Sequence, residues 1–324
     1  MQTATRLAAL AAAGAAALCV PLTAGASQLI DRNAASVSLK VNKEGYALLT
    51  YAAHGEMHHT LAWGAINARQ PTRGVPQVRF KKDYAGGWGV FHTQYWRSFK
   101  NACRPYDGPA LAWFVAACKA PDGSYWALQS WQTPLPDLGF TPWLARQRAW
   151  ELHLSHWQGP LARLEVWTDW VYGGRWHSLF GRLSYLGRPV YGFGTTNVGA
   201  PTDGYGRLLY LDTFNSAYGQ GWRRENSFVS HNPTGVFCYG FYPFDPTKGG
   251  YAYPSGYGGG KRGPGNGERY RMTVNGPGVT PDVMWQGSGL PDYDASNQQD
   301  VQYERQMNSV LDSILSVDRL CRQH

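Results

Sequence analysis

Several features that mark well-defined protein classes are missing from this sequence of 324 residues. After residue 26, no apolar run is long enough to cross a membrane as a helix. The basic residues are scattered and form no run longer than a pair, so a nucleic-acid partner is not expected. The motifs H-E-x-x-H and G-x-S-x-G, a P-loop, and a G-x-G-x-x-G between a strand and a helix are all absent. We therefore expect no cofactor.

The first residues have the pattern of a targeting segment. Arg6 precedes an apolar run over residues 7–20 and the small-residue site Ala24-Gly25-Ala26, which predicts a secretory signal peptide at residues 1–26. Cys19 would suit a lipoprotein, but Leu18 stands where a small residue is expected. We expect a secreted protein, either extracellular or associated with the cell envelope. Removing Arg6 lowers the net charge from +8 to +7, which is compatible with an anionic envelope polymer as partner.

Cysteine is scarce, and its number indicates crosslinks. The chain has five cysteines, and export would leave Cys103, Cys118, Cys238 and Cys321. An even number in an oxidising compartment predicts two disulfides, for which three pairings are possible. We favour Cys103–Cys118, because the two share one local unit, together with Cys238–Cys321.

Tryptophan, in contrast, is abundant. The stretch 88–176 contains eleven of the fourteen tryptophans. So many large rings indicate a big buried core, a stacking surface, or both. We expect about two thirds of these rings to lie in the interior.

The rest of the chain predicts antiparallel strands. Alternating apolar residues and turn signals such as Pro121-Asp122-Gly123 predict strands at 37–41, 46–52, 57–63, 75–82, 111–118, 124–131, 150–154, 164–172, 176–185, 188–193, 208–214, 235–242 and 269–275. The strand at 111–118 is almost wholly apolar and should be buried on both faces. The four strands between 150 and 193 are expected to follow one another with tight turns.

The end of the chain changes to helical spacing. Apolar residues recur at intervals of three and four, which predicts an amphipathic helix over about residues 297–321. Residues 248–267 are rich in glycine and tyrosine and predict a mobile loop. We expect a mainly β fold of antiparallel sheets, a sandwich or distorted barrel, formed by a single domain over residues 27–324.

Exposed aromatic rings are the first candidate for function. Rings stack on the apolar faces of sugars, while neighbouring polar groups bind the hydroxyls. The candidate ligand-binding residues are Trp88, Trp96, Trp126, Trp167, Trp170 and Tyr172. Core packing is the simpler explanation for most of them.

Paired carboxylates are the second candidate. Glycoside hydrolysis needs two acids about 5–9.5 Å apart. Glu165 and Asp169 face the same way on one predicted strand, but their backbones lie about 13 Å apart at ~3.3 Å per residue. Glu151, or later Asp203 and Asp212, could supply a partner. Solvated or ion-paired surface acids are the alternative.

Histidines offer a third candidate. His54, Glu56 and His58 would share one face of an extended strand, and such ligands suit zinc. Gly55 indicates a turn that would separate them, and Glu151, His153 and His156 form only a looser set. An exposed polar turn is the alternative, so no metal is expected.

Four segments carry a resemblance: AWGAINA, NACRPYDGPALAWFVAACKAPDGSYWALQ, NPTGVFCYGFYP and GPGVTPDVMW. The chain resembles exported proteins of unknown function from high-GC Gram-positive bacteria. The resemblance covers most of the mature chain and implies a location and a shared fold, but no activity and no site residue.

These observations favour an extracellular or envelope-associated binding protein whose exposed aromatic rings contact a glycan or similar polymer. One alternative is a secreted hydrolase that uses carboxylates near Trp167. Another is a structural or interaction protein without a small-molecule site. The sequence does not predict an oligomeric state.

Overall fold

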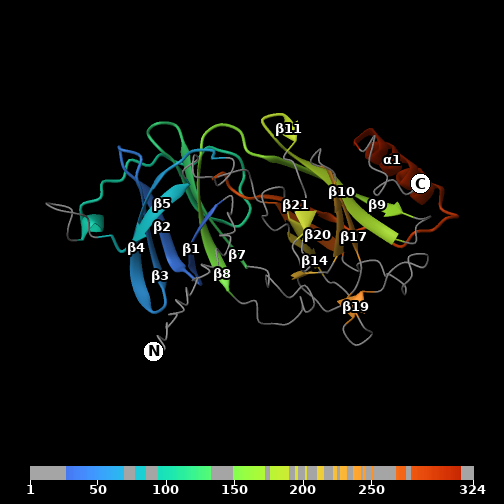
Figure 1. Cartoon of the computed structure of the whole chain (residues 1–324), viewed down its shortest axis with the longest axis horizontal. Coiled ribbons are helices and arrows are strands. Elements are labelled where there is room, and N and C mark those ends of the chain that lie inside the picture. The colour runs from blue at the N-terminus through green and yellow to red at the C-terminus, as the bar shows by residue number, and fades with distance from the viewer. Residues whose placement is uncertain are drawn as a thin grey trace, which may run out of the picture.

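The structure is a computed structural model that describes most of the chain after residue 26. The described residues are 27–68, 77–84, 94–132, 149–171, 176–189, 268–274 and 279–314, with strand segments at 194–195, 201–202, 210–214, 222–224, 227–231, 236–241, 244–245 and 250–251. Within them the fold is mainly β, all strand pairs are antiparallel, and one α-helix lies near the C-terminal end (Figure 1). The predicted fold class is confirmed as a sandwich-like arrangement of open sheets.

The first sheet is a meander with the strand order β2-β3-β4-β5. Its members are β2 (Ala35–Val41), β3 (Ala47–Ala53), β4 (Glu56–Gly64) and β5 (Val78–Lys82). His54 and Gly55 join β3 to β4 with φ angles of 54° and 84°, and a two-residue hairpin turn of this type needs positive φ at both positions.

The second sheet packs against the first and has the strand order β1-β8-β7-β6. Its members are β1 (Gln28–Arg32), β6 (Phe114–Lys119), β7 (Tyr125–Gln132) and β8 (Trp150–Trp157). Trp126, Leu128 and Leu154 from this sheet meet Leu49 and Tyr51 from the first, and all five side chains are fully buried. These two layers, called here the N-terminal sheets, form one sandwich.

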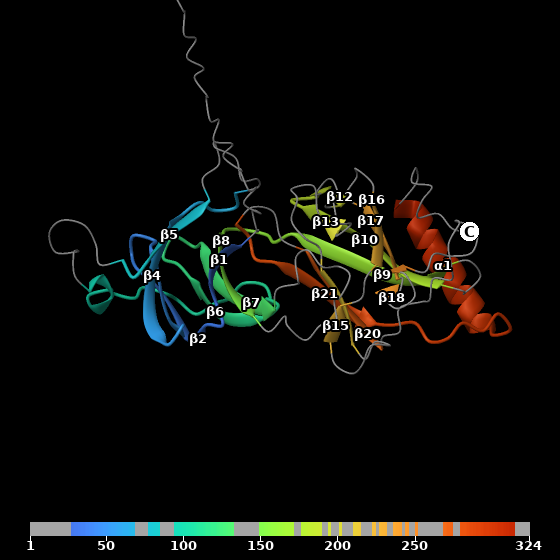
Figure 2. The ribbon, with the colours of Figure 1, turned by 60° about the horizontal axis from the view of Figure 1, so that its bottom comes forward.

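Two further sheets, called here the C-terminal sheets, follow (Figure 2). One contains β9 (Arg163–Val171), β10 (Trp176–Tyr185), β11 (Arg188–Pro189), β16 (Ser227–His231) and β17 (Val236–Phe241). The other has the order β15 (Trp222–Arg224), β14 (Tyr210–Phe214), β20 (Arg269–Val274), β21 (Val283–Ser288). Two short pairs are β12 (Gly194–Thr195) with β13 (Pro201–Thr202), and β18 (Phe244–Asp245) with β19 (Gly250–Tyr251).

A second core and the helix complete the C-terminal sheets. Leu179 and Leu183 of β10 pack with Tyr270 and Met272 of β20. Helix α1 (Gln298–Ile314) lies along β9, where the hydroxyl of Tyr303 donates to the carbonyl oxygen of Thr168 at 3.1 Å. The buried side chains of α1 include Met307 and Leu311, as the apolar spacing predicts.

A short segment before β21 joins the two sandwiches. The backbone N–H of His156 in β8 donates to the carbonyl oxygen of Val279 at 2.9 Å, and Val279 is fully buried in the N-terminal core. The side chain of Gln129 in β7 also bonds the backbone N–H and carbonyl oxygen of Asp282. A segment close to the C-terminus therefore helps to complete the core formed by the first half of the chain.

The strand predictions are confirmed in type, with two errors in arrangement. Residues 111–118 are not buried on both faces, since Phe114 is 54% exposed. The four strands between 150 and 193 do not form one meander, because β8 belongs to the N-terminal sheets while β9, β10 and β11 belong to the C-terminal ones. The predictions missed β1 and β21, and also β12, β13, β15, β16, β18 and β19.

Other predictions concern residues outside this description. The signal peptide at 1–26, the helix beyond residue 314 and most of the loop 248–267 lie outside the described residues. In the part that is described, no helix is both long and apolar enough to span a membrane. The single-domain organisation stays a prediction.

Candidate functional site

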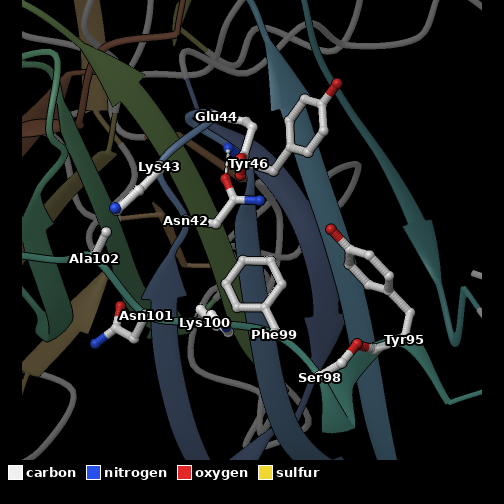
Figure 3. Close-up of a pocket in the computed structure, with 10 residues that line it drawn as sticks. All are labelled: Asn42, Lys43, Glu44, Tyr46, Tyr95, Ser98, Phe99, Lys100, Asn101 and Ala102. Atoms are coloured by element: carbon white, nitrogen blue, oxygen red, sulfur yellow. Dashed lines mark hydrogen bonds between the residues drawn. The ribbon is translucent and has the colours of Figure 1, made fainter.

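A hollow of about 560 Å³ opens at one end of the first sheet, a size within the range of small-ligand sites. It lies between the β2–β3 turn and the segment that leads to Cys103. The lining residues are Asn42, Lys43, Glu44, Tyr46, Tyr95, Ser98, Phe99, Lys100, Asn101 and Ala102. In Figure 3, Tyr46, Tyr95 and Phe99 lie on one side, with Lys43, Asn101 and Ala102 on the other.

Hydrogen bonds within the β2–β3 turn fix the first wall. The side-chain oxygen of Asn42 accepts from the backbone N–H of Tyr46 at 2.8 Å, and the backbone N–H of Asn42 donates to the carbonyl oxygen of Tyr46 at 2.9 Å. Gly45 completes the turn at φ 81°, a left-handed conformation that favours glycine. The tight turn leaves the Tyr46 side chain 43% exposed beside the hollow.

The second wall begins at the short helix η1 (Tyr95–Arg97). Trp96 stacks on the His59 ring of β4 with a centroid distance of 4.2 Å, which holds η1 against the first sheet. Tyr95 meets Phe99 edge to face at 5.8 Å. Burial, followed by the nearby charge of Glu44, raises the pKa of Tyr95, so its hydroxyl stays protonated at neutral pH.

The segment after Phe99 is tied to β2 and to the second sheet. The side-chain oxygen of Asn101 accepts from the backbone N–H groups of Val41 and Cys103, both at 3.1 Å. The backbone N–H of Ala102 donates to the carbonyl oxygen of Val41 at 2.7 Å. The Cys103–Cys118 disulfide then links this wall to β6. The hollow is thus built on a well-connected part of the fold, which favours pre-formed binding.

Three charged residues also line the hollow. Lys43, Glu44 and Lys100 are all exposed, and none of them has an ion pair within the described residues. The combination of flat rings with free charged groups suits a ligand that has both apolar faces and polar substituents.

The predicted aromatic candidates do not form one surface. Trp126 is fully buried and stacks on His156, and Trp170 is buried against Tyr293 and Tyr303 of the helix region. Trp167 is half-buried and stacks on Phe180. Trp96 lies next to the hollow through η1. Trp88 and Tyr172 lie outside the described residues.

The predicted carboxylates also lie apart, each in its own surroundings. Glu151 pairs with Arg32 and His153, and Glu165 pairs with Arg163 and Arg182. Among the later candidates, Asp212 bonds Arg271, and Asp203 lies outside the described residues. These ion pairs agree with the alternative interpretation, in which the acids are solvated or ion-paired and do not form a catalytic pair.

Asp169 of β9 is the exception, because it is completely buried. Neither carboxylate oxygen has a hydrogen bond of good geometry in the described structure, although the backbone N–H of Trp170 lies close enough to favour ionisation slightly. Burial, with the charge of Glu304 as a second cause, raises the pKa of Asp169 to about 8. A protonated acid at neutral pH is chemically a possible proton donor, but this one has no exposed surface.

The histidine candidates each have a different partner. His54 bonds Asp31 at 2.9 Å, His58 bonds Asp83 at 2.9 Å and the carbonyl oxygen of Ala53 at 3.1 Å, and Glu56 is exposed. The described ranges contain no group of three side chains placed to hold a metal ion. The turn at His54-Gly55 separates the histidines, as Gly55 indicated.

One predicted disulfide is present and the other falls outside the description. Cys103 and Cys118 form the expected bond. The side chain of Cys238 and all of Cys321 lie outside the described residues.

Comparison with known proteins gives no family to which the chain can be assigned. No family model, no curated protein and no solved structure matches the chain. The fold and the hollow therefore define the protein only as a mainly β protein with an aromatic-lined pocket.

Proposed function

We propose that this protein is an extracellular or cell-envelope binding protein, and that it contacts a glycan or similar polymer through the hollow beside Tyr46, Tyr95 and Phe99. The proposal assigns the binding role to these residues and to the charged groups around them. Most of the described tryptophans serve instead as packing.

One observation carries the proposal. Three aromatic rings gather on one side of a hollow whose other residues are mostly polar or charged. A pyranose has apolar CH faces and polar edges, so it matches both kinds of wall. The tight turn at Asn42 and the disulfide at Cys103 support this by holding both walls before a ligand arrives.

The proposed location rests on the leader-like residues 1–26 and on the Cys103–Cys118 disulfide, which is typical of oxidising compartments. The resemblance to exported proteins of high-GC Gram-positive bacteria belongs to the same proposal. Expression of the full chain in a bacterial host, followed by fractionation and N-terminal sequencing, tests it. A product in the medium or envelope that begins at Ser27 is expected, and an intact cytoplasmic chain would contradict it.

Binding is tested with the purified protein on an array of envelope and plant polysaccharides. We expect retention on at least one glycan, and the variants Tyr95→Ala and Phe99→Ala should weaken binding to it by about fivefold or more, since stacked rings contribute roughly 1 kcal/mol each. Phe114→Ala is the matched control, because Phe114 is an exposed ring away from the hollow. Absence of binding to every glycan, or equal losses in all three variants, would contradict the proposal.

A further inference from the structure

The charges around the hollow indicate which kind of saccharide it accepts. Two lysines, Lys43 and Lys100, line the hollow together with one acid, Glu44. Lys43 comes from the β2–β3 turn and Lys100 from the segment after η1, so the two lysines belong to different walls. Positive groups without carboxylate partners attract an anionic group on a ligand that enters the hollow.

Two other lysines of the N-terminal sheets are paired with carboxylates. Lys82 bonds Asp31 at 2.6 Å, and Lys119 bonds Asp107 at 2.8 Å. Within the described residues, Lys43 and Lys100 have no such carboxylate. Unlike Lys82 and Lys119, the two lysines at the hollow are therefore available for a negative group on a ligand.

We propose that the hollow binds an acidic saccharide, with the apolar face of a sugar ring on the aromatic side and its anionic substituent between Lys43 and Lys100. This inference rests on the proposed glycan-binding function and names the ligand class of the same site. A lysine ammonium is a mobile point charge on a flexible four-carbon stem, so it reaches a carboxylate or a sulfate ester equally well. Glu44 acts against the anion and limits how strongly the site holds it.

The test uses pairs of probes that share a backbone and differ in charge. Oligogalacturonate is compared with its methyl ester, and dextran sulfate with dextran, by calorimetry at low and high salt. The acidic member of at least one pair should bind three- to tenfold more tightly at low salt, since two exposed ion pairs contribute roughly 1 kcal/mol together. The preference should shrink at high salt, because exposed charges are screened within about 10 Å at 0.1 M ionic strength.

Charge variants assign the preference to the hollow. The double variant Lys43→Met, Lys100→Met should lose the preference for the acidic probe and bind both members of the pair with similar affinity. Glu44→Gln should increase the preference. Arg305→Met, which removes one positive charge from the exposed surface of α1, is the control and should leave the preference unchanged.

The outcomes separate the two proposals. Equal binding of acidic and neutral probes overturns the acidic-saccharide inference and leaves glycan binding in place. A preference that survives in the double variant, or that falls equally in Arg305→Met, shows general attraction to a basic protein and also overturns the inference. If no probe and no array glycan binds, both proposals fail.

Discussion

Asp31 of the N-terminal sheets and Asp169 of the C-terminal sheets are two carboxylates with opposite pKa shifts. Asp31 in β1 is largely buried, and its burial alone would raise its pKa, but hydrogen bonds from Lys82, from the backbone of Arg32 and from His54 hold the pKa well below its usual range. Asp169 in β9 is also buried but lacks such partners, so its pKa rises to about 8. Burial raises the pKa of both carboxyls, and hydrogen-bond partners outweigh it at Asp31 but not at the more deeply buried Asp169.

The largest expected effect is the pH dependence caused by Asp169. The folded-state pKa of Asp169 lies above its value in the unfolded chain, so the unfolded chain releases this proton at a lower pH. The free energy of unfolding of the protein should therefore fall as the pH rises from about 4 to about 8. Asp169→Asn should remove this dependence and be more stable than the wild type at pH 8 by a few kcal/mol, given roughly 1.4 kcal/mol per pKa unit. Urea unfolding at pH 5 and pH 8 measures the difference. If both proteins show the same pH profile, Asp169 is ionised in the folded protein.

The next effect concerns the disulfide, the crosslink seen in the N-terminal sheets. Replacing both Cys103 and Cys118 with serine should lower the unfolding free energy by about 3 kcal/mol, the entropic value for a closed loop of this size. Glycan binding at the hollow should weaken in parallel, because Cys103 anchors its second wall. The wild type under reducing conditions serves as the reference for the double variant. A variant as stable as the oxidised wild type would show that the bond does not constrain the unfolded chain.

Patterns in the sequence predict local structure, but they do not predict which distant segments come into contact. Period-two alternation and turn residues such as Asp122-Gly123 identified most strands, since they describe local backbone geometry. The same signals cannot say which strands become neighbours, so β8 was grouped with β9 although the two belong to different sheets. Strand β1 lacks alternation, and its pairing with β8 across more than a hundred residues leaves no local trace.

The candidate site was missed for the same physical reason. Its walls come from residues 42–46 and 95–102, which are brought together by hydrogen bonds to Val41 and by the stacking of Trp96 on His59. Tryptophan density indicated a stacking surface, but indole rings are large and apolar and most of them fill the interior instead. One feature of the sequence could have indicated the site. The turn Asn42-Lys43-Glu44-Gly45 is followed at once by Tyr46, so it predicts an exposed aromatic ring at this end of the sheet.

A smaller effect is expected from breaking the Asp31 cluster. Asp31→Asn should destabilise the protein by about 1–2 kcal/mol at pH 7, since it removes partners of Lys82 and His54 that are only partly buried. A depressed pKa stabilises the fold above the unfolded value, and this contribution is lost as pH falls from about 4 toward the lower folded-state value. The difference between the variant and the wild type should therefore shrink progressively as the pH is lowered below about 4. Asp107→Asn, which breaks the exposed pair with Lys119, is the control and should scarcely move the unfolding midpoint.

The smallest expected effect tests whether Arg271 couples the unfolding of the N-terminal sheets to that of the C-terminal sheets. The Arg271 guanidinium of β20 lies 4.4 Å from the Trp222 ring centroid and 5.4 Å from that of Trp113, so it connects a C-terminal sheet with the segment before β6. Arg271→Lys keeps the positive charge beside Asp212 but loses the planar stacking and one of the two guanidinium hydrogen bonds to that carboxylate, which together should cost about 1 kcal/mol. Arg269→Lys is the matched control, because Arg269 lies over Phe214 and Trp222 within the C-terminal sheets alone. Fluorescence and circular dichroism followed during unfolding should give transitions that separate in the Arg271 variant and coincide in the control. If they coincide in both, the segment 279–282 is sufficient to make the two regions unfold together, and the stacked arginine adds packing without coupling.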